Sequence, residues 1–255
     1  MAISGISGSS NNYYGMIASG KRINSAADDA AGLAIAEKLE SQANGYDVGR
    51  DNAAAGQDML RVAEGGLGSI MDSLQRMREL SVQASNTAVY GKDELGAMQN
   101  EIDQLKQSIQ DAAKYTQFNT MNLLDGSKES WNIATNPDGS GSKVTTPNST
   151  LAALGIENYD VSGGNFDMKV LDDAISKVSD AMSSIGASYN GLEHRMNFNS
   201  YASYNLTASK SRIEDLDIPK AVSEKEKQRL LNEYKMHFLR RQIEDQNQKA
   251  GLLRF

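Results

Sequence analysis

Histidines and paired carboxylates are the side chains of this sequence that could perform acid–base or metal chemistry. The two histidines, His194 and His237, each fall in a segment with helical periodicity, and neither belongs to a metal-binding pattern such as HExxH. We therefore interpret both as surface or packed helix residues. The chain contains no cysteine, which excludes disulfides, thiolate zinc sites and cysteine nucleophiles.

The acidic pairs Asp28–Asp29 and Asp172–Asp173 stand where predicted helices begin. Helix capping and the favourable effect of negative charge at a helix N-terminus account for both pairs. The run Gly65-Gly66-Leu67-Gly68 lacks the lysine and the preceding strand of a phosphate-binding loop. The sequence therefore predicts no catalytic site, cofactor or metal, and it indicates an assembly protein rather than an enzyme.

Composition narrows the class of protein further. The chain has 255 residues and a net charge of -7, and an acidic chain repels the phosphates of nucleic acids. No apolar run reaches the roughly eighteen residues that a membrane span requires. Met1–Ser10 is rich in glycine and serine, without a positive start or an apolar stretch, so it is not a secretory signal peptide. If the protein is exported, another route must carry it.

Three segments carry apolar residues at alternating spacings of three and four, the pattern of helices that pack side by side. We call these stripes the first, second and third seams. The first contains Leu60, Ala63, Leu67, Ile70, Leu74 and Met77, the second Met98, Ile102, Leu105, Ile109 and Ala112, and the third Leu171, Ile175, Val178, Met182, Ile185, Tyr189, Leu192 and Met196. Gly65, Gly66 and Gly68 interrupt the first seam, and they mark either a break or a place where another helix comes close.

The segments between and beyond the seams complete the predicted organisation. Ser85–Lys92 forms a short turn, so the first two helices should lie antiparallel, and Pro219 should break the third. Strand candidates are Trp131–Ala134, Ser142–Thr146 and Phe166–Val170, although a strandless Gly/Ser linker remains an alternative. We expect a flexible, helix-poor arm (1–18), the N-terminal half of a helical rod (19–126), a β-hairpin region (127–170), the C-terminal half of the rod (171–217) and a charged C-terminal helix (218–255).

The C-terminal tail combines a high charge with an apolar stripe. Leu231, Tyr234 and Phe238 form the stripe, and Leu239 and Ile243 flank it. An isolated helix of this kind is marginally stable in water. We expect the tail to become ordered on a partner. The fold class is therefore mainly α: a long antiparallel, coiled-coil-like rod formed by the two halves of the chain, with a small β-hairpin region between them.

Several ordered motifs resemble bacterial flagellin, the subunit of the flagellar filament. The run Ser19-Gly20-Lys21-Arg22-Ile23-Asn24-Ser25-Ala26-Ala27-Asp28-Asp29-Ala30-Ala31-Gly32-Leu33-Ala34-Ile35 is similar to the family's N-terminal signature. The other matching motifs are Ala63-Glu64-Gly65-Gly66-Leu67, Leu74-Gln75-Arg76-Met77-Arg78-Glu79-Leu80-Ser81-Val82-Gln83-Ala84, Thr116-Gln117-Phe118-Asn119, Asn122-Leu123-Leu124-Asp125-Gly126, Leu192-Glu193-His194, Asn205-Leu206-Thr207-Ala208 and Ser211-Arg212-Ile213-Glu214-Asp215-Leu216-Asp217.

The resemblance implies a structural filament subunit used in motility, with no enzymatic activity. It implies an extracellular location, export through the flagellar apparatus without a cleaved signal peptide, and self-assembly or co-assembly with other flagellins. An export chaperone would hold the C-terminal helix, for which we name Leu231, Tyr234, Phe238, Leu239 and Ile243. The family's contact with the innate immune Toll-like receptor 5 maps onto Arg76, Leu80 and Glu101, which could equally serve only as subunit contacts in the filament.

Two features depart from the family's pattern. Only eighteen residues precede Ser19, and Ala221–Phe255 is heavily charged, whereas in the family the two ends pair to line the inner tube of the filament. Four readings follow: a polymerising flagellin, a minor or junction subunit, a secreted flagellin-like protein that does not polymerise, and an enzymatic variant. The absence of HExxH and of a large central insert argues against the last.

Overall fold

The computed structural model describes residues 13–252 of the chain and the side chains of residues 13–249. Its long helices are α2 (Ala26–Ala84), α3 (Lys92–Tyr115), α5 (Lys169–Glu214) and α6 (Ile218–Leu252). A short helix, α4 (Leu151–Leu154), and two small hairpins lie between α3 and α5 in the sequence. The predicted fold class, mainly α with a small β-hairpin region, is confirmed.

The chain divides into two compact units. The central unit is Asn44–Ser203, and the terminal unit combines Met1–Ala43 with Tyr204–Phe255. Helices α2 and α5 each supply residues to both units, whereas α3, α4 and the hairpins belong to the central unit and α6 to the terminal unit.

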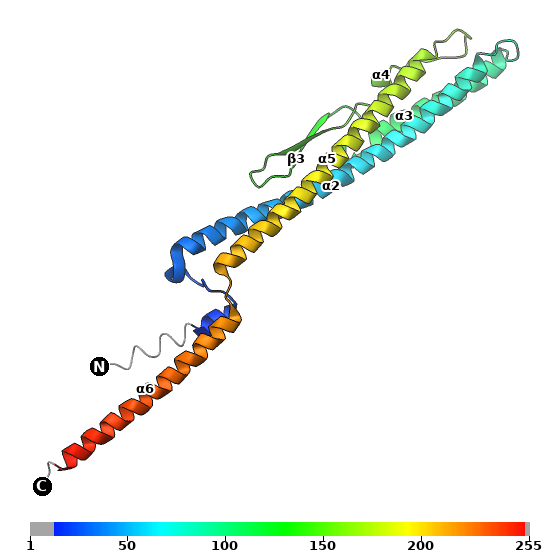
Figure 1. Cartoon of the computed structure of the whole chain (residues 1–255). Coiled ribbons are helices and arrows are strands. Elements are labelled where there is room, and N and C mark those ends of the chain that lie inside the picture. The colour runs from blue at the N-terminus through cyan, green and yellow to red at the C-terminus, as the bar shows by residue number, and fades with distance from the viewer. Residues whose placement is uncertain (1–12, 253–255) are drawn as a thin grey trace. The chain divides into compact units, whose positions relative to one another are not determined.

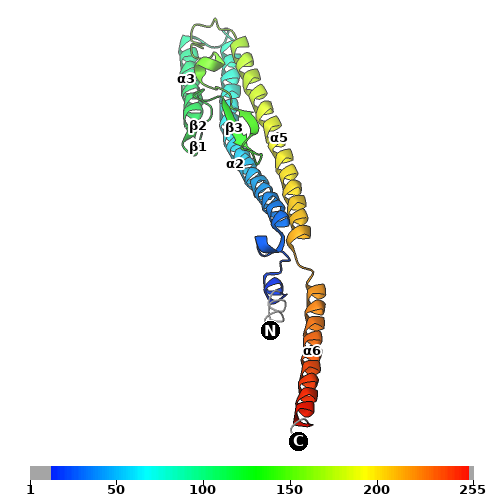
Figure 2. The ribbon, with the colours of Figure 1, turned by 90° about the vertical axis from the view of Figure 1, so that its left-hand side faces the viewer.

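In the central unit, α3 lies beside α2 and runs in the opposite direction, and α5 lies along the other side of α2 (Figures 1 and 2). The turn over residues 85–91 is too short for any other arrangement of α2 and α3. All six residues of the first seam are fully buried between these helices. In the second seam, Ile102 and Ile109 are buried, and Met98, Leu105 and Ala112 are partly buried.

The third seam shows a strict sevenfold period. Leu171, Val178, Ile185 and Leu192 are each buried, and each follows the previous one by seven residues. The next position in the series is Asn199, which is also fully buried. Its Nδ2 donates a hydrogen bond of 2.8 Å to the carbonyl oxygen of Thr135. Asn199 thus occupies the next heptad position after Leu192, and it holds the backbone carbonyl of Thr135 beside α5.

Thr135 directly follows the first strand of the larger hairpin, which pairs β3 (Ser130–Ala134) with β4 (Gly141–Thr145) antiparallel. The smaller hairpin joins β1 (Gln117–Phe118) to β2 (Met121–Asn122). Two of the three predicted strands are therefore present.

The third predicted strand, Phe166–Val170, is wrong. Asp167 instead caps the start of α5, because its carboxylate accepts the backbone N–H of Lys169 at 2.9 Å. Phe166 packs edge-on against Tyr159, with ring centroids 6.1 Å apart.

Two glycines of α2 mark close approaches of other segments. The helix is unbroken through residues 65–68, so these glycines do not end it. A methyl group at Gly66 would lie 2.4 Å from Oγ1 of Thr116, at the end of α3. A methyl group at Gly49 would lie 2.3 Å from the carbonyl oxygen of Thr135. At both positions only glycine fits without displacing a neighbour.

In the terminal unit, residues 13–19 are helical, so this part of the expected helix-poor arm is wrong. The remaining residues of the arm, including Ile3 and Ile6, lie outside the described residues. The charged tail that was expected to order on a partner is a single helix, α6.

Asp28 and Asp29, at the start of α2, accept hydrogen bonds from different backbone groups. The carboxylate of Asp28 accepts the backbone N–H groups of Asn24 and Ser25 at 3.0 and 2.9 Å, which lowers its pKa. Asp29 has an extended backbone and accepts the N–H of Gly32 at 2.8 Å, so it caps the rest of the helix. Both carboxylates are thereby explained as caps, as the sequence predicts.

The third long helix ends earlier than predicted. α5 stops at Glu214, and Pro219 lies in the first turn of α6, where its missing N–H is harmless. The break occurs because the N–H of Leu216 donates to the carbonyl of Gly20, at 2.9 Å, instead of continuing the helix. Pro219 therefore begins a helix rather than ending one.

Candidate assembly surfaces

Three places could carry function: the surface around Arg76, the apolar face of α6, and the junction between residues 20–25 and 213–217. The first lies in the central unit and the other two lie in the terminal unit.

Arg76 and Glu101 are brought together across α2 and α3. Nε of Arg76 donates to Oε1 of Glu101 at 2.7 Å, and its Nη1 donates to Glu79 one helical turn away at 3.0 Å. These two carboxylates raise the pKa of the guanidinium. Both side chains of the interhelical pair remain more than 40% exposed, so they offer a surface patch of two opposite charges.

Leu80 does not belong to that surface. It is only 3% exposed and packs with the core residues of α2, α3 and α5. The structure therefore brings two of the three predicted receptor residues together at the surface and places the third beneath it.

The tail residues Leu231, Tyr234, Phe238, Leu239 and Ile243 are all exposed on α6, between 45% for Leu231 and 73% for Tyr234. Leu230 and Met236 are exposed on α6 as well. Large apolar side chains in such density on one helix mark an interaction site. We call this set the tail stripe.

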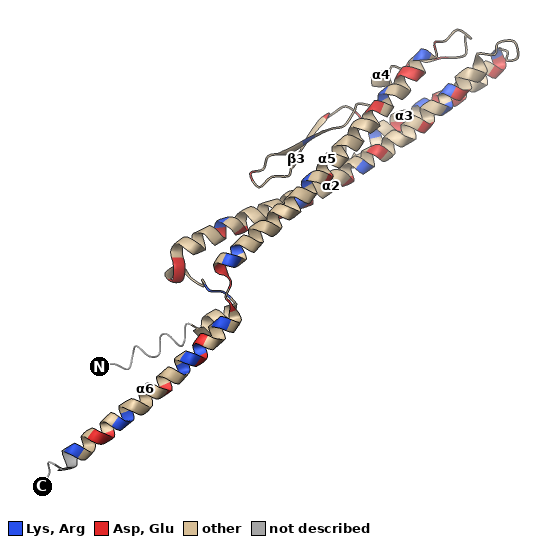
Figure 3. Ribbon diagram, in the orientation of Figure 1, with Lys and Arg blue, Asp and Glu red and all other residues tan. Residues whose placement is uncertain are grey.

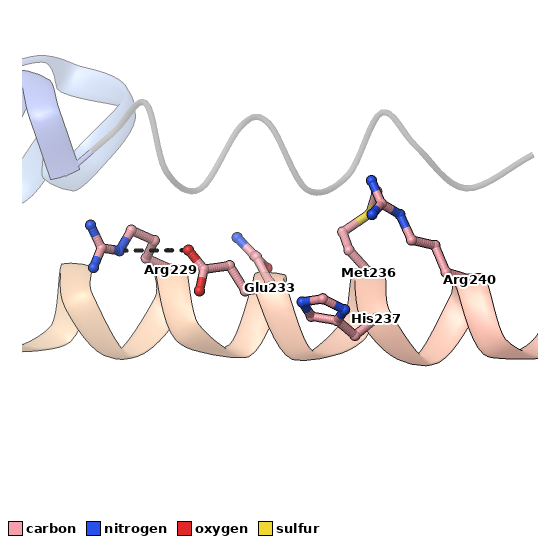
Figure 4. A pocket seen from close by; sticks show the side chains of 6 residues that line it. Arg229, Glu233, Met236, His237 and Arg240 are labelled. Atoms are coloured by element: carbon pink, nitrogen blue, oxygen red, sulfur yellow. Dashed lines mark ion pairs between the residues drawn. The ribbon is translucent and has the colours of Figure 1, made fainter.

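Charged side chains recur along the whole length of α6 (Figure 3). Figure 4 shows Arg229, Glu233, His237 and Arg240 along one side of the helix, as their spacings of four, four and three require. Arg229 pairs with Glu226 at 3.0 Å and reaches Glu233 at 4.0 Å. These four residues form a charged side of α6, whereas apolar and charged side chains are mixed around the rest of the helix.

The remaining candidates for chemistry do not converge. His194 and His237 are exposed on separate helices. Asp172 forms an ion pair with Arg78 at 2.7 Å, which joins α5 to α2. Among residues 13–252, no group of three or more histidine, aspartate or glutamate side chains is arranged to hold a metal ion. None of the helices in this range contains an apolar stretch of the length that a membrane span requires.

The junction is the feature that the sequence analysis missed. Residues 20–22 run antiparallel to residues 214–216: the N–H of Arg22 donates to the carbonyl of Glu214 at 2.7 Å, and Lys21 forms a bridge with Asp215. The guanidinium of Arg22 also donates to the carbonyl of Ile213 at 2.5 Å. The signal available in the sequence was opposite charge, since Lys21 and Arg22 lie in one segment and Glu214 and Asp215 in the other.

Comparison with known proteins finds one family that matches most of the chain. The profile of the bacterial flagellin N-terminal helical region matches residues 3–129, and that of the bacterial flagellin C-terminal helical region matches residues 168–250. The chain is 34% identical to a flagellin of Bacillus subtilis over 85% of its length and 84% of the relative.

It is also 34% identical to the flagellar filament 33 kDa core protein of Treponema phagedenis, over 84% of this chain and 82% of that protein. The crystal structure of Bacillus cereus flagellin superimposes with a TM-score of 0.51 at 26% identity, covering 58% of this chain and 88% of that one.

Proposed function

This chain belongs to the bacterial flagellin family and is a structural subunit of the flagellar filament, and we propose that it joins the filament by burying the tail stripe of α6 against neighbouring subunits. The observation that carries this proposal is the exposure of five large apolar side chains on one helix. Removing apolar surface from water yields about 25 cal/mol per Å², so packing these side chains in an assembly would stabilise it.

The test is elongation of filament fragments by purified protein, followed by electron microscopy. We expect growth with the natural sequence and strongly reduced growth with Phe238→Ser. Arg240→Gln, which alters the charged side of the same helix (Figure 4), is the matched control and should elongate normally. Equal growth of all three proteins would reject the tail stripe as the assembly contact.

The same assay separates three roles. Elongation by this chain alone supports a polymerising subunit. Growth only when a companion flagellin is added supports a minor or junction subunit that co-assembles. No growth in either case supports a secreted flagellin-like protein that does not polymerise by itself. We favour the first role, and we assign the protein no catalytic activity.

Before assembly, the tail stripe is the expected binding site of an export chaperone. A chaperone that covers Leu231, Tyr234, Phe238, Leu239 and Ile243 would keep this surface from premature association. The protein would then leave the cell through the flagellar apparatus without a cleaved signal peptide. If deletion of Glu224–Phe255 leaves chaperone binding intact, this role is wrong.

Recognition by Toll-like receptor 5 is a separate proposal for the Arg76–Glu101 patch. Both charges are accessible and held in a fixed pair, whereas buried Leu80 would act by supporting α2 from inside. In a receptor reporter assay with soluble protein, Arg76→Ala should lower the signal, and Arg61→Ala, an exposed arginine elsewhere on α2, should not. An unchanged signal with Arg76→Ala would exclude this surface.

A further inference from the structure

A buried carboxylate lies at the junction of the terminal unit. Glu214 is the last residue of α5, and its side chain is only 6% exposed. One of its oxygens, Oε1, pairs with Nζ of Lys21, and the other, Oε2, lies 3.5 Å from Nζ of Lys210. Lys210 also pairs with Glu40 on α2, at 3.0 Å. The result is an alternating row of two acids and two bases that links three segments of the chain.

The chemistry of this position requires the two lysines. A carboxylate at the C-terminus of a helix faces the negative end of the helix dipole, and burial makes an unpaired charge costly. Lys21 and Lys210 offset both effects, and the hydrogen bond from Lys21 is the main reason that the pKa of Glu214 is lowered. The carboxylate therefore stays charged and holds both lysines.

The carboxylate and the backbone act on the same short segment. The main-chain carbonyl of Glu214 accepts the N–H of Arg22, while its side chain holds the neighbouring Lys21. Beyond the junction, Nζ of Lys225 on α6 lies 4.1 Å from the ring centroid of Tyr14, in the helical segment of residues 13–19. The N-terminal segment is thus attached at both ends to residues that follow Ile213.

We propose that Glu214 is a positioning residue for assembly: through Lys21 and Lys210 it fixes the N-terminal segment against the start of α6, so that both terminal segments enter the filament as one unit. This inference rests on the proposed function of the tail in assembly. It explains why Glu214 and Lys21, which lie in two motifs far apart in the sequence, form an ion pair. The junction, rather than either terminal segment alone, then holds the subunit in the conformation that assembles.

The test compares the full-length natural protein with Glu214→Gln, which keeps the shape and removes the charge. Hydrogen exchange of the monomer reports the junction directly, through the amides of Arg22 and Leu216. We expect these amides to exchange at least about tenfold faster in Glu214→Gln, as the loss of a charge-assisted interaction implies, and filament elongation to slow. Glu233→Gln removes an exposed carboxylate near Arg229 in the same unit and should change neither measurement.

A double-variant cycle separates positioning from general stability. If Glu214 acts through Lys21, then Lys21→Met with Glu214→Gln should exchange no faster than Glu214→Gln alone. Additive effects, or unchanged exchange in Glu214→Gln, would overturn the inference. Failure of the natural protein to elongate would reject the filament role instead, while the exchange rates would still decide whether the junction depends on Glu214.

Discussion

Replacing Gly49 by alanine should destabilise the central unit, although the same change in an open part of the helix should stabilise it. The new methyl group would lie 2.3 Å from the carbonyl oxygen of Thr135. Favourable contacts between nonbonded heavy atoms lie at about 3.5–4.0 Å, so the hairpin must move away from α2. That movement also breaks the 2.8 Å bond from Asn199 to the same oxygen.

The expected magnitude follows from three contributions. Overpacking in a well-packed interior costs about 1–3 kcal/mol. Loss of the buried hydrogen bond costs about 1 kcal/mol more, because Asn199 is fully buried and Oδ1 of its amide already lacks a partner. Alanine in place of glycine within a helix returns about 1 kcal/mol. The net effect is a loss of about 1–3 kcal/mol in the free energy of unfolding.

Gly65→Ala is the matched control, because Gly65 lies in the same helix and a methyl group there meets nothing within 4 Å. It should raise the free energy of unfolding by about 1 kcal/mol. Chemical denaturation can be followed by the fluorescence of Trp131, the single tryptophan, which lies buried on β3. If Gly49→Ala is as stable as Gly65→Ala, the carbonyl group of Thr135 does not pack against Gly49.

Three further outcomes are expected. Tyr159→Phe removes a 2.8 Å hydrogen bond to buried Ser81 and should lower the free energy of unfolding by about 0.5–1.5 kcal/mol; an unchanged denaturation midpoint would contradict this. Lys106→Met removes donation to two backbone carbonyls after α4 and should make residues 156–165 more sensitive to limited proteolysis, whereas unchanged cleavage would show that these bonds are dispensable. The pKa values of Asp28 and Glu214 are lowered in the folded protein, so their stabilisation is present above the ordinary value of about 4 and is lost as the pH falls through the lowered values. Melting curves from pH 7 to 3 should show this loss, and a smaller loss in Asp28→Asn; identical acid profiles would refute it.

The heptad seams predicted much of the helical part of the core, whereas buried residues of the hairpin region, such as Trp131 and Val144, lie outside them. Leu67, Ile102 and Val178 are buried as their spacing required, because helical periodicity brings apolar side chains to one face whatever the tertiary context. The failures occurred where local and tertiary preferences compete. Alternation over Phe166–Val170 resembles a strand, but capping by Asp167 starts a helix, and Pro219 looks like a terminator although it starts one.

The candidate surfaces were predictable in part. Exposure of the tail stripe follows from apolar residues in a segment that is otherwise rich in charged residues. The burial of Leu80 was open to prediction, because Leu80 follows Met77 of the first seam by three residues; the contact transferred by resemblance carries no information on how this core packs. Glu214 was missed for another reason: its partner Lys21 is 193 positions away, and single-sequence periodicity does not pair distant charges.

The buried amide of Asn199 has a consequence for how α5 finds its place. Leu171, Val178, Ile185 and Leu192 are nearly equivalent in size and polarity, so a slide of α5 by seven residues would exchange one apolar side chain for another at almost every layer. Such a slide would move Asn199 away from Thr135 and into an apolar site, at a cost of about 1–3 kcal/mol for an unbonded amide. The apolar residues alone would allow several registers of α5 that differ by seven residues. Only the native register lets the amide of Asn199 bond to Thr135 next to the hairpin.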